Sequence, residues 1–143
     1  MAITQAVCNT FKSELLGAVH DFDSGSGQVF KLALYTSAAN LSAATTAYTA
    51  TGEVANSGQY AATGGILLSQ TVSLDGSVGI VDFADLSFTG VTLSALGAVI
   101  YNTSASSKSV CVLDFGADKT ATSGTFTIVF PANTSAAAIL RIA

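Results

Sequence analysis

ILLSQTVSLDGSVGIVDF, residues 66–83, contains two apolar runs separated by a short polar turn. The runs are Ile66–Leu74 and Val78–Phe83, and Asp75-Gly76 lies between them, with Ser77 beyond. An Asp-Gly pair between two apolar runs is a strong hairpin signal, because both residues tolerate the positive φ that a tight turn needs. This stretch therefore predicts an antiparallel β-hairpin.

Further strand patterns lie on both sides of the hairpin. Upstream, Val29–Tyr35 alternates in polarity, and Phe30, Leu32 and Leu34 would form its core face. Downstream, the turn-forming segments TSASSK (103–108), GADKTATS (116–123) and PANTS (131–135) separate short apolar runs. These runs are Leu86–Phe88, Thr92–Asn102, Ser109–Phe115, Gly124–Phe130 and Ala136–Ile142. About seven or eight strands at this spacing predict a mainly β fold over residues 28–143, an antiparallel β-sandwich or jelly roll.

The first 22 residues have a different period. Their apolar residues recur at intervals of four or three, which is the spacing of one face of an α-helix. These residues are Ile3, Val7, Phe11, Leu15, Val19 and Phe22. The turn-rich segment DFDSGSG, residues 21–27, would end such a helix. The sequence therefore predicts one N-terminal amphipathic helix over residues 3–22, joined to the β-sandwich in a single domain, residues 1–143.

Residues 36–65 follow neither period. They are rich in Ser, Thr, Ala and Gly and too polar to form core, so we expect a long excursion over the surface, with a short strand around Tyr48. A connection of this length without secondary structure of its own is uncommon unless it carries function. We therefore expect the excursion to take part in binding.

Charged residues make up only 10% of the 143 residues, and the net charge is −4. The five basic residues are scattered, which argues against nucleic-acid binding, and no apolar run approaches the length of a membrane-spanning helix. The opening MAITQAVCNTFKSELL lacks the basic and apolar regions of a secretory signal, so we expect synthesis in a cytoplasm. A free monomer usually carries more charge to protect its strand edges. The composition thus predicts a homo-oligomer, a trimer or a dimer.

Few residues are able to carry chemistry. His20, the single histidine, falls in the last turn of the predicted helix, where we expect it to face the helix dipole or solvent. Cys8 and Cys111 have apolar neighbours, and we expect both to be buried and reduced. Asp21-Phe22-Asp23 resembles the opening of a calcium loop, but the glycine and glutamate that complete such a loop are missing.

Asp82 and Asp114 share an Asp-Phe context at strand ends. Two carboxylates across a sheet could serve a glycosidase or hold an ion, but aspartate at a strand end more often caps the following turn. The sequence therefore predicts no catalytic residue, no cofactor site and no metal site, and a protein that is not an enzyme.

Several segments together resemble a family of small structural proteins encoded by tailed bacteriophages and prophages. They are AVCNTFKSELLGAVHDF (6–22), VFKLALYTSAANLSAATTAYTATGEV (29–54), YAATGG (60–65), GAVIYN (97–102) and VLDFGADKTATSGTFTIVFP (112–131). The resemblance spans nearly the whole chain and implies a virion component, either a capsid decoration (cement) protein or a part of the neck, tail or fibre. A glycan-binding adhesin module is the alternative from another class, with Tyr35, Tyr48, Tyr60 and Tyr101 as a sugar-stacking platform, of which Tyr48 and Tyr60 lie in the excursion.

The partners that this resemblance implies are the phage major capsid protein and further copies of the chain, on the capsid exterior of the virion. Attachment of this kind needs apolar side chains that the sandwich core does not use. We expect Phe11 and Leu15 of the opening helix, with Tyr48 and Tyr60 of the excursion, to form the partner interface.

Overall fold

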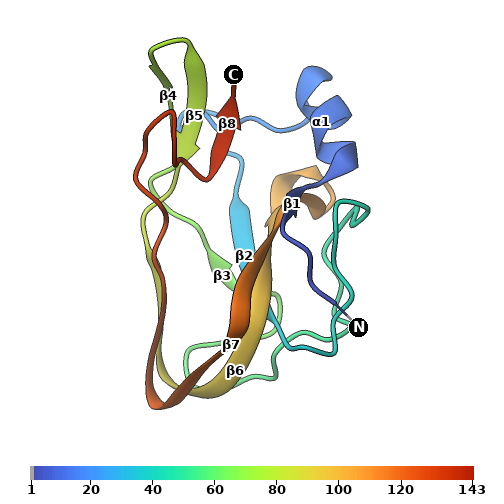
Figure 1. Cartoon of the computed structure of the whole chain (residues 1–143), viewed down its shortest axis with the longest axis vertical. Coiled ribbons are helices and arrows are strands. Elements are labelled where there is room, and N and C mark those ends of the chain that lie inside the picture. Colours follow the sequence, from blue (N-terminus) through green and yellow to red (C-terminus); the bar gives the residue numbers. More distant parts are fainter. Residues whose placement is uncertain (1) are drawn as a thin grey trace.

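The structure is a computed structural model that describes residues 2–143. Within them the chain is mainly β, as the sequence predicts, with two antiparallel sheets and one short helix (Figure 1). The strand order is β1-β7-β6-β2-β3 in the larger sheet and β4-β5-β8 in the smaller one. The elements are β1 (Ala6–Val7), α1 (Asn9–Leu16), β2 (Phe30–Tyr35), β3 (Gly65–Ile66), β4 (Thr71–Asp75), β5 (Val78–Asp82), β6 (Leu86–Asn102), the 3-10 turn η1 (Thr103–Ala105), β7 (Lys108–Ile128) and β8 (Leu140–Ile142).

Strands β6 and β7, of 17 and 21 residues, pair along their length as one long two-stranded ribbon. The sequence predicted two shorter strands in place of each, and that prediction is wrong. Residues 116–123, predicted as a turn, lie inside β7, where Thr120 pairs with Ser94. The glycines in this ribbon mark bends rather than ends, because Gly90 and Gly116 adopt positive φ while the pairing continues on either side. Figure 1 shows the ribbon running down one layer, turning at the bottom and rising in the other.

Strand β2 is buried on both faces. The predicted core face of Phe30, Leu32 and Leu34 is confirmed, and Phe30 stacks on Phe22 with ring centroids 4.4 Å apart. The opposite face is also enclosed, because the Tyr35 hydroxyl donates to the Thr49 carbonyl, 2.6 Å away, in the excursion. The excursion therefore covers one side of the sheet, and the prediction that it is too polar to form core is wrong.

The predicted hairpin is confirmed. Asp75 pairs with Val78, so Gly76 and Ser77 make the turn, one residue later than the Asp75-Gly76 pair suggested, and Gly76 has a φ of +64°. Strand β8, at the end of the chain, then pairs with β5 and completes the smaller sheet.

The N-terminal helix is much shorter than predicted, Asn9–Leu16 instead of 3–22. Ile3 forms a parallel bridge with Leu41, and β1 pairs antiparallel with β7. These backbone partners override the helical spacing, since each hydrogen bond to a neighbouring strand is unavailable to a helix. Ile3 and Phe22 are buried as the spacing suggested, but outside the helix.

The helix ends in a Schellman motif with an unusual residue at its key position. The Val19 N–H donates to the Glu14 carbonyl at 2.9 Å, and the Ala18 N–H donates to the Leu15 carbonyl at 3.1 Å. Ala18 occupies the left-handed position with a φ of +59°, where glycine is preferred because a Cβ is strained there.

Replacing Ala18 by glycine is expected to stabilise the fold by about 1 kcal/mol, because the strain of the left-handed Cβ disappears. Urea unfolding followed by circular dichroism measures the change. Ser13→Gly, in the exposed middle of α1, is the matched control and should destabilise by about 0.5 kcal/mol, because glycine has a low helix propensity. A loss of stability in Ala18→Gly would contradict the assigned helix end.

Candidate functional site

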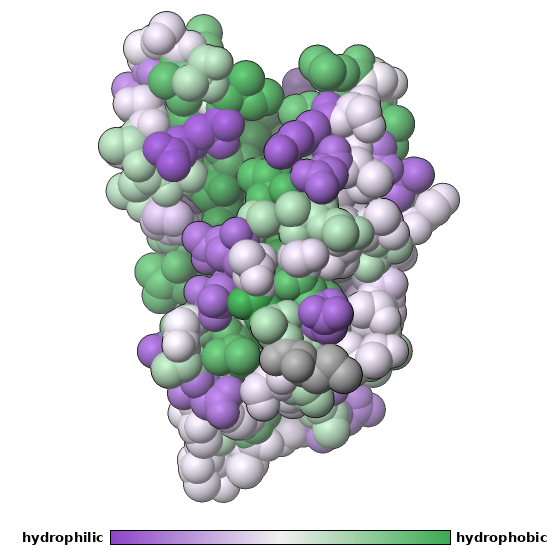
Figure 2. All heavy atoms as spheres, turned by 45° about the vertical axis from the view of Figure 1, so that its right-hand side comes forward, coloured by the Kyte–Doolittle hydropathy of each residue, from purple (hydrophilic) through white to green (hydrophobic). Residues whose placement is uncertain are grey.

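An open apolar groove of about 560 Å³ lies between helix α1 and the smaller sheet. Figure 2 shows it as a hollow lined by hydrophobic side chains between two lobes at one end of the molecule. Leu15 and Leu16 line the helical side. Val72, Val81 and Leu140 line the sheet side. The two walls of the groove, helix α1 and the smaller sheet, therefore come from segments that are far apart in the sequence.

The strand register explains why the sheet wall is apolar. Val72, Val81 and Leu140 pair in one row across β4, β5 and β8, and Leu74, Gly79 and Ile142 pair in a second row two residues away. Residues two apart on a strand share a face, so both rows belong to one surface. Gly79 contributes no side chain to this surface, which widens the groove at its centre.

Large apolar side chains remain exposed at the edges of the groove. Leu16 is 91% exposed and Ile142 is 63% exposed. Lys12, Asp21 and Arg141 also line the groove, so its few charges include both signs. Exposed apolar side chains gathered around a concave apolar surface are typical of a binding site for another molecule.

His20 lies at the base of the groove and is buried, which corrects the expectation that it faces solvent or only the helix dipole. Its Nε2 lies 3.0 Å from Glu14 Oε1, and its Nδ1 lies 3.1 Å from Asn102 Nδ2. Asn102 Oδ1 accepts a hydrogen bond from the Ser104 N–H, which fixes the amide so that its NH₂ group faces His20. Nδ1 therefore accepts, and the proton is on Nε2, which donates to Glu14.

Glu14 also contacts Lys108, with 3.3 Å between Oε2 and Nζ. Burial raises the pKa of Glu14, but hydrogen bonds from His20 and Lys108 outweigh it, so the pKa lies below its ordinary value. Both ring nitrogens of His20 are thus occupied by protein groups. His20 connects the segment after α1 to the end of β6 and leaves no lone pair for a substrate.

Removing the amide of Asn102 is expected to destabilise the protein by about 3 kcal/mol, because His20 Nδ1, the Ser104 N–H and the Gln28 side chain all lose a partner. Thermal and urea unfolding of Asn102→Ala measure this. Asn133→Ala, at an exposed position, is the control and should change stability by less than about 0.5 kcal/mol. Equal stability of both variants would refute the bridging role of Asn102.

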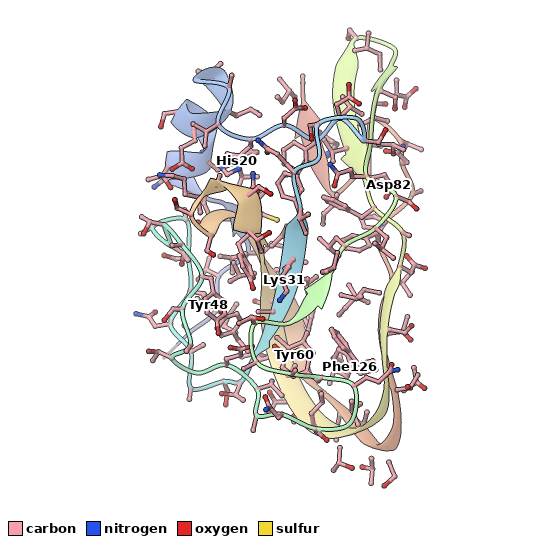
Figure 3. All side chains as sticks on the ribbon, turned by 180° about the vertical axis from the view of Figure 1, so that it is seen from behind. His20, Lys31, Tyr48, Tyr60, Asp82 and Phe126 are labelled. Atoms are coloured by element: carbon pink, nitrogen blue, oxygen red, sulfur yellow. The ribbon has the colours of Figure 1, made fainter. Side chains whose placement is uncertain are left out.

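Hydrogen bonds of the four tyrosines hold the excursion to the larger sheet. The tyrosines are Tyr35, described above, and Tyr48, Tyr60 and Tyr101. Glu53 accepts hydrogen bonds from the Tyr48 hydroxyl, from the Tyr60 hydroxyl at 2.8 Å and from the Thr63 N–H at 2.8 Å. Tyr60, which is labelled with Tyr48 in Figure 3, also accepts the Leu34 N–H of β2 at 2.8 Å. Tyr101 donates to the Thr63 carbonyl. The hydroxyls of this tyrosine cluster therefore point to protein partners.

The four residues predicted to form the partner interface do not lie at one site. Leu15 lines the groove, and Phe11 lies at its base, only 3% exposed. Tyr60 is 1% exposed and Tyr48 is half-buried against Tyr101, with ring centroids 5.0 Å apart. The structure therefore brings Phe11 and Leu15 together at one site but places the two excursion tyrosines elsewhere. The sequence missed Val72, Ile142 and Leu16, although the alternation of Val72 and Leu74 in β4 was a signal for an apolar face.

Burial, followed by the Glu53 carboxylate, raises the pKa of Tyr48 to about 12. An unfolded tyrosine ionises near pH 10. Because the unfolded chain releases this proton first, stability present below about pH 10 should fall as the pH rises towards about 12. Burial also raises the pKa of Tyr35 and Tyr60, which adds to the loss.

Urea midpoints at about pH 8 and about pH 11 measure this effect. Tyr48→Phe should start less stable, since Glu53 loses a donor, but should lose less stability between the two pH values. If Tyr48→Phe lost as much stability between the two pH values as the native sequence, the ionisation of Tyr48 would not contribute to the pH dependence of stability.

Of the other candidate groups, the two cysteines lie close together and the two aspartates lie apart. Cys8 and Cys111 are free and buried, as predicted. Asp82 lies in β5 and Asp114 in β7, in different sheets, and Asp114 Oδ1 accepts the Gly116 N–H at 2.9 Å. Among residues 2–143, no three or more His, Cys, Asp or Glu side chains gather to hold a metal ion. No helix in this part of the chain has the length and apolar character needed to cross a membrane.

Comparison of the chain with protein-family models, with curated proteins and with solved structures gives no match.

Proposed function

We propose that this chain is a structural protein of a tailed-phage virion and that it decorates the outside of the capsid, where it bridges and stabilises major capsid subunits. The observation that carries this proposal is the apolar groove between α1 and the β4-β5-β8 sheet, whose walls leave Leu16 and Ile142 exposed. A decoration protein needs a docking surface on a rigid scaffold, and it needs no reaction centre.

The energetics of the groove suit attachment to a repeated surface. Burying a side chain such as Leu16 contributes about 2 kcal/mol, so an apolar segment of a capsid subunit in this groove gives a moderate single-site affinity. Many identical contacts around a closed shell then raise the overall avidity of attachment by multivalency. The low charge of the chain also favours this role, since an assembly covers surface that a monomer would keep charged.

A neck, tail or fibre position would use the same groove on a different partner, and the two positions differ in where the protein is found on the particle. The glycan-binding alternative is less well supported, because Tyr60 is buried and the hydroxyls of Tyr48 and Tyr60 donate to Glu53. Stacking on a sugar requires an exposed ring face. We propose no catalytic activity and no cofactor.

Leu16→Glu is expected to weaken binding to particles that lack the protein by tenfold or more, because a buried leucine contributes about 2 kcal/mol and a carboxylate in the groove is desolvated. Gly79→Leu should act in the same direction by filling the groove from the opposite wall, since a Cβ there meets the Ile142 carbonyl oxygen at an ordinary 3.8 Å. Co-sedimentation of purified protein with particles measures binding.

Leu68→Glu is the matched control, because Leu68 is 64% exposed and lies outside the groove lining. It should leave binding unchanged. If Leu16→Glu and Gly79→Leu bound as well as Leu68→Glu, attachment through the groove would be refuted.

A further inference from the structure

Strand β4 has an open edge. It is the outer strand of the smaller sheet, and within residues 2–143 it pairs with β5 alone. All five of its residues, Thr71–Asp75, are exposed, and Leu74 is 75% exposed. Exposed edge strands usually carry a lysine, a proline or a bulge that prevents pairing with another chain. The sequence TVSLD contains no lysine and no proline, and the β4–β5 register is continuous.

The turn fixes which backbone groups of β4 face outward. Asp75 and Val78 flank the two-residue turn, and in such hairpins the flanking residues exchange hydrogen bonds with each other. Bonded and non-bonded pairs then alternate along the strands, so Ser73 also bonds towards β5. The N–H and C=O groups of Val72 and Leu74 consequently point to the open edge.

We propose that β4 pairs with β4 of a second copy of this chain, antiparallel and centred on Ser73. In this register Val72 of one copy lies opposite Leu74 of the other, and both residues have outward-facing backbone groups. Each such pair can therefore exchange both of its backbone hydrogen bonds. Antiparallel pairing of one strand with itself is symmetric about a two-fold axis, so the product is a closed dimer.

The side chains are complementary in the same register. Val72 meets Leu74 on the face that continues the groove wall, which places two apolar side chains together. On the other face Thr71 meets Asp75, and the threonine hydroxyl can donate to Asp75 Oδ1, while Oδ2 accepts the Ser135 N–H of its own chain at 2.6 Å. Asp75 is the single charged residue of β4, and this arrangement keeps the two Asp75 side chains apart, whereas parallel pairing would place them opposite each other.

This inference rests on the proposed function in one respect: the capsid surface is where we expect the β4–β4 dimer to become stable. A pairing of five residues per copy is small beside the interfaces of about 1,200–2,000 Å² that hold stable complexes, so we expect a weak dimer in free solution. Copies held side by side on a shell reach an effective concentration of about millimolar, which favours the pair. Two-fold pairing also selects the dimer over the trimer among the oligomers expected from the composition.

Two lysine substitutions on the same face of β4 test the register. Ser73→Lys places the two new ammonium groups directly opposite each other and should weaken the dimer by about fivefold or more. Thr71→Lys adds the same charge but places each ammonium opposite Asp75 of the other copy, so it should leave the dimer unchanged or tighten it. Sedimentation equilibrium of the purified chain from about 10 µM to about 1 mM measures the dissociation constants.

A cysteine cross-link gives a second readout. Ser73 of the two copies would form a non-bonded pair with Cα atoms about 4.5 Å apart, a separation that a disulfide can span. Ser73→Cys treated with oxidised glutathione should therefore give a cross-linked dimer, while Ser13→Cys on exposed α1 should not. Cys8 and Cys111 are buried in both variants and do not interfere.

Three results would overturn the proposal: a native chain that stays monomeric up to about 1 mM, equal dissociation constants for the two lysine variants, or no cross-link in Ser73→Cys. These measurements use the purified chain without particles. A chain that dimerises through β4 but does not bind particles would refute the proposed function and leave this inference intact, and the reverse result would refute the inference alone.

Discussion

Backbone pairing between β6 and β7 extends from Leu86–Ile128 to Asn102–Lys108 and supplies strands to both layers of the sandwich. Three of its four register shifts fall between Phe88 and Gly97, where the ribbon passes from one layer to the other, and the fourth lies between Ile100 and Tyr101. The β6–β7 ladder is interrupted at this bend, and the excursion supplies partners there: the Thr89 N–H donates to Gln59 Oε1 at 3.0 Å and the Thr92 N–H donates to Ser57 Oγ at 2.8 Å. Strand β2 then adds to β6 and β1 adds to β7, so the larger sheet depends on this ribbon.

The same ribbon positions the groove. Asn102, the last residue of β6, bonds to His20, and His20 bonds to Glu14 of α1. Phe22 packs between the two sides, with ring centroids 6.0 Å from Phe11 and 6.2 Å from Phe83. Of these rings, Phe11 and Phe22 line the floor of the groove between the helix and the smaller sheet.

The sequence predicted the features that depend on local chemistry. Gly76, in the hairpin turn, and the apolar neighbours of Cys8 and Cys111 are local signals, and the structure confirms the hairpin and the buried thiols. The mainly β class followed from the same kind of signal. Features that depend on distant partners were missed. The spacing of Ile3 suggested a helix because its strand partner Leu41 is 38 positions away, and His20 looked solvent-exposed because Asn102 is 82 positions away.

The groove could not be predicted from the sequence because its two walls meet only in the folded chain, although Phe11 and Leu15, which the sequence predicted as interface residues, both line it. We propose that this groove attaches the chain to the outside of a phage capsid. The most direct measurement is electron cryo-microscopy of purified particles combined with a mass-spectrometric copy number. We expect density on the capsid exterior, with α1 and the β4-β5-β8 sheet facing the shell, and a copy number that scales with the major capsid protein. Density confined to the neck or tail, or absence of the chain from the particle, would contradict this proposal.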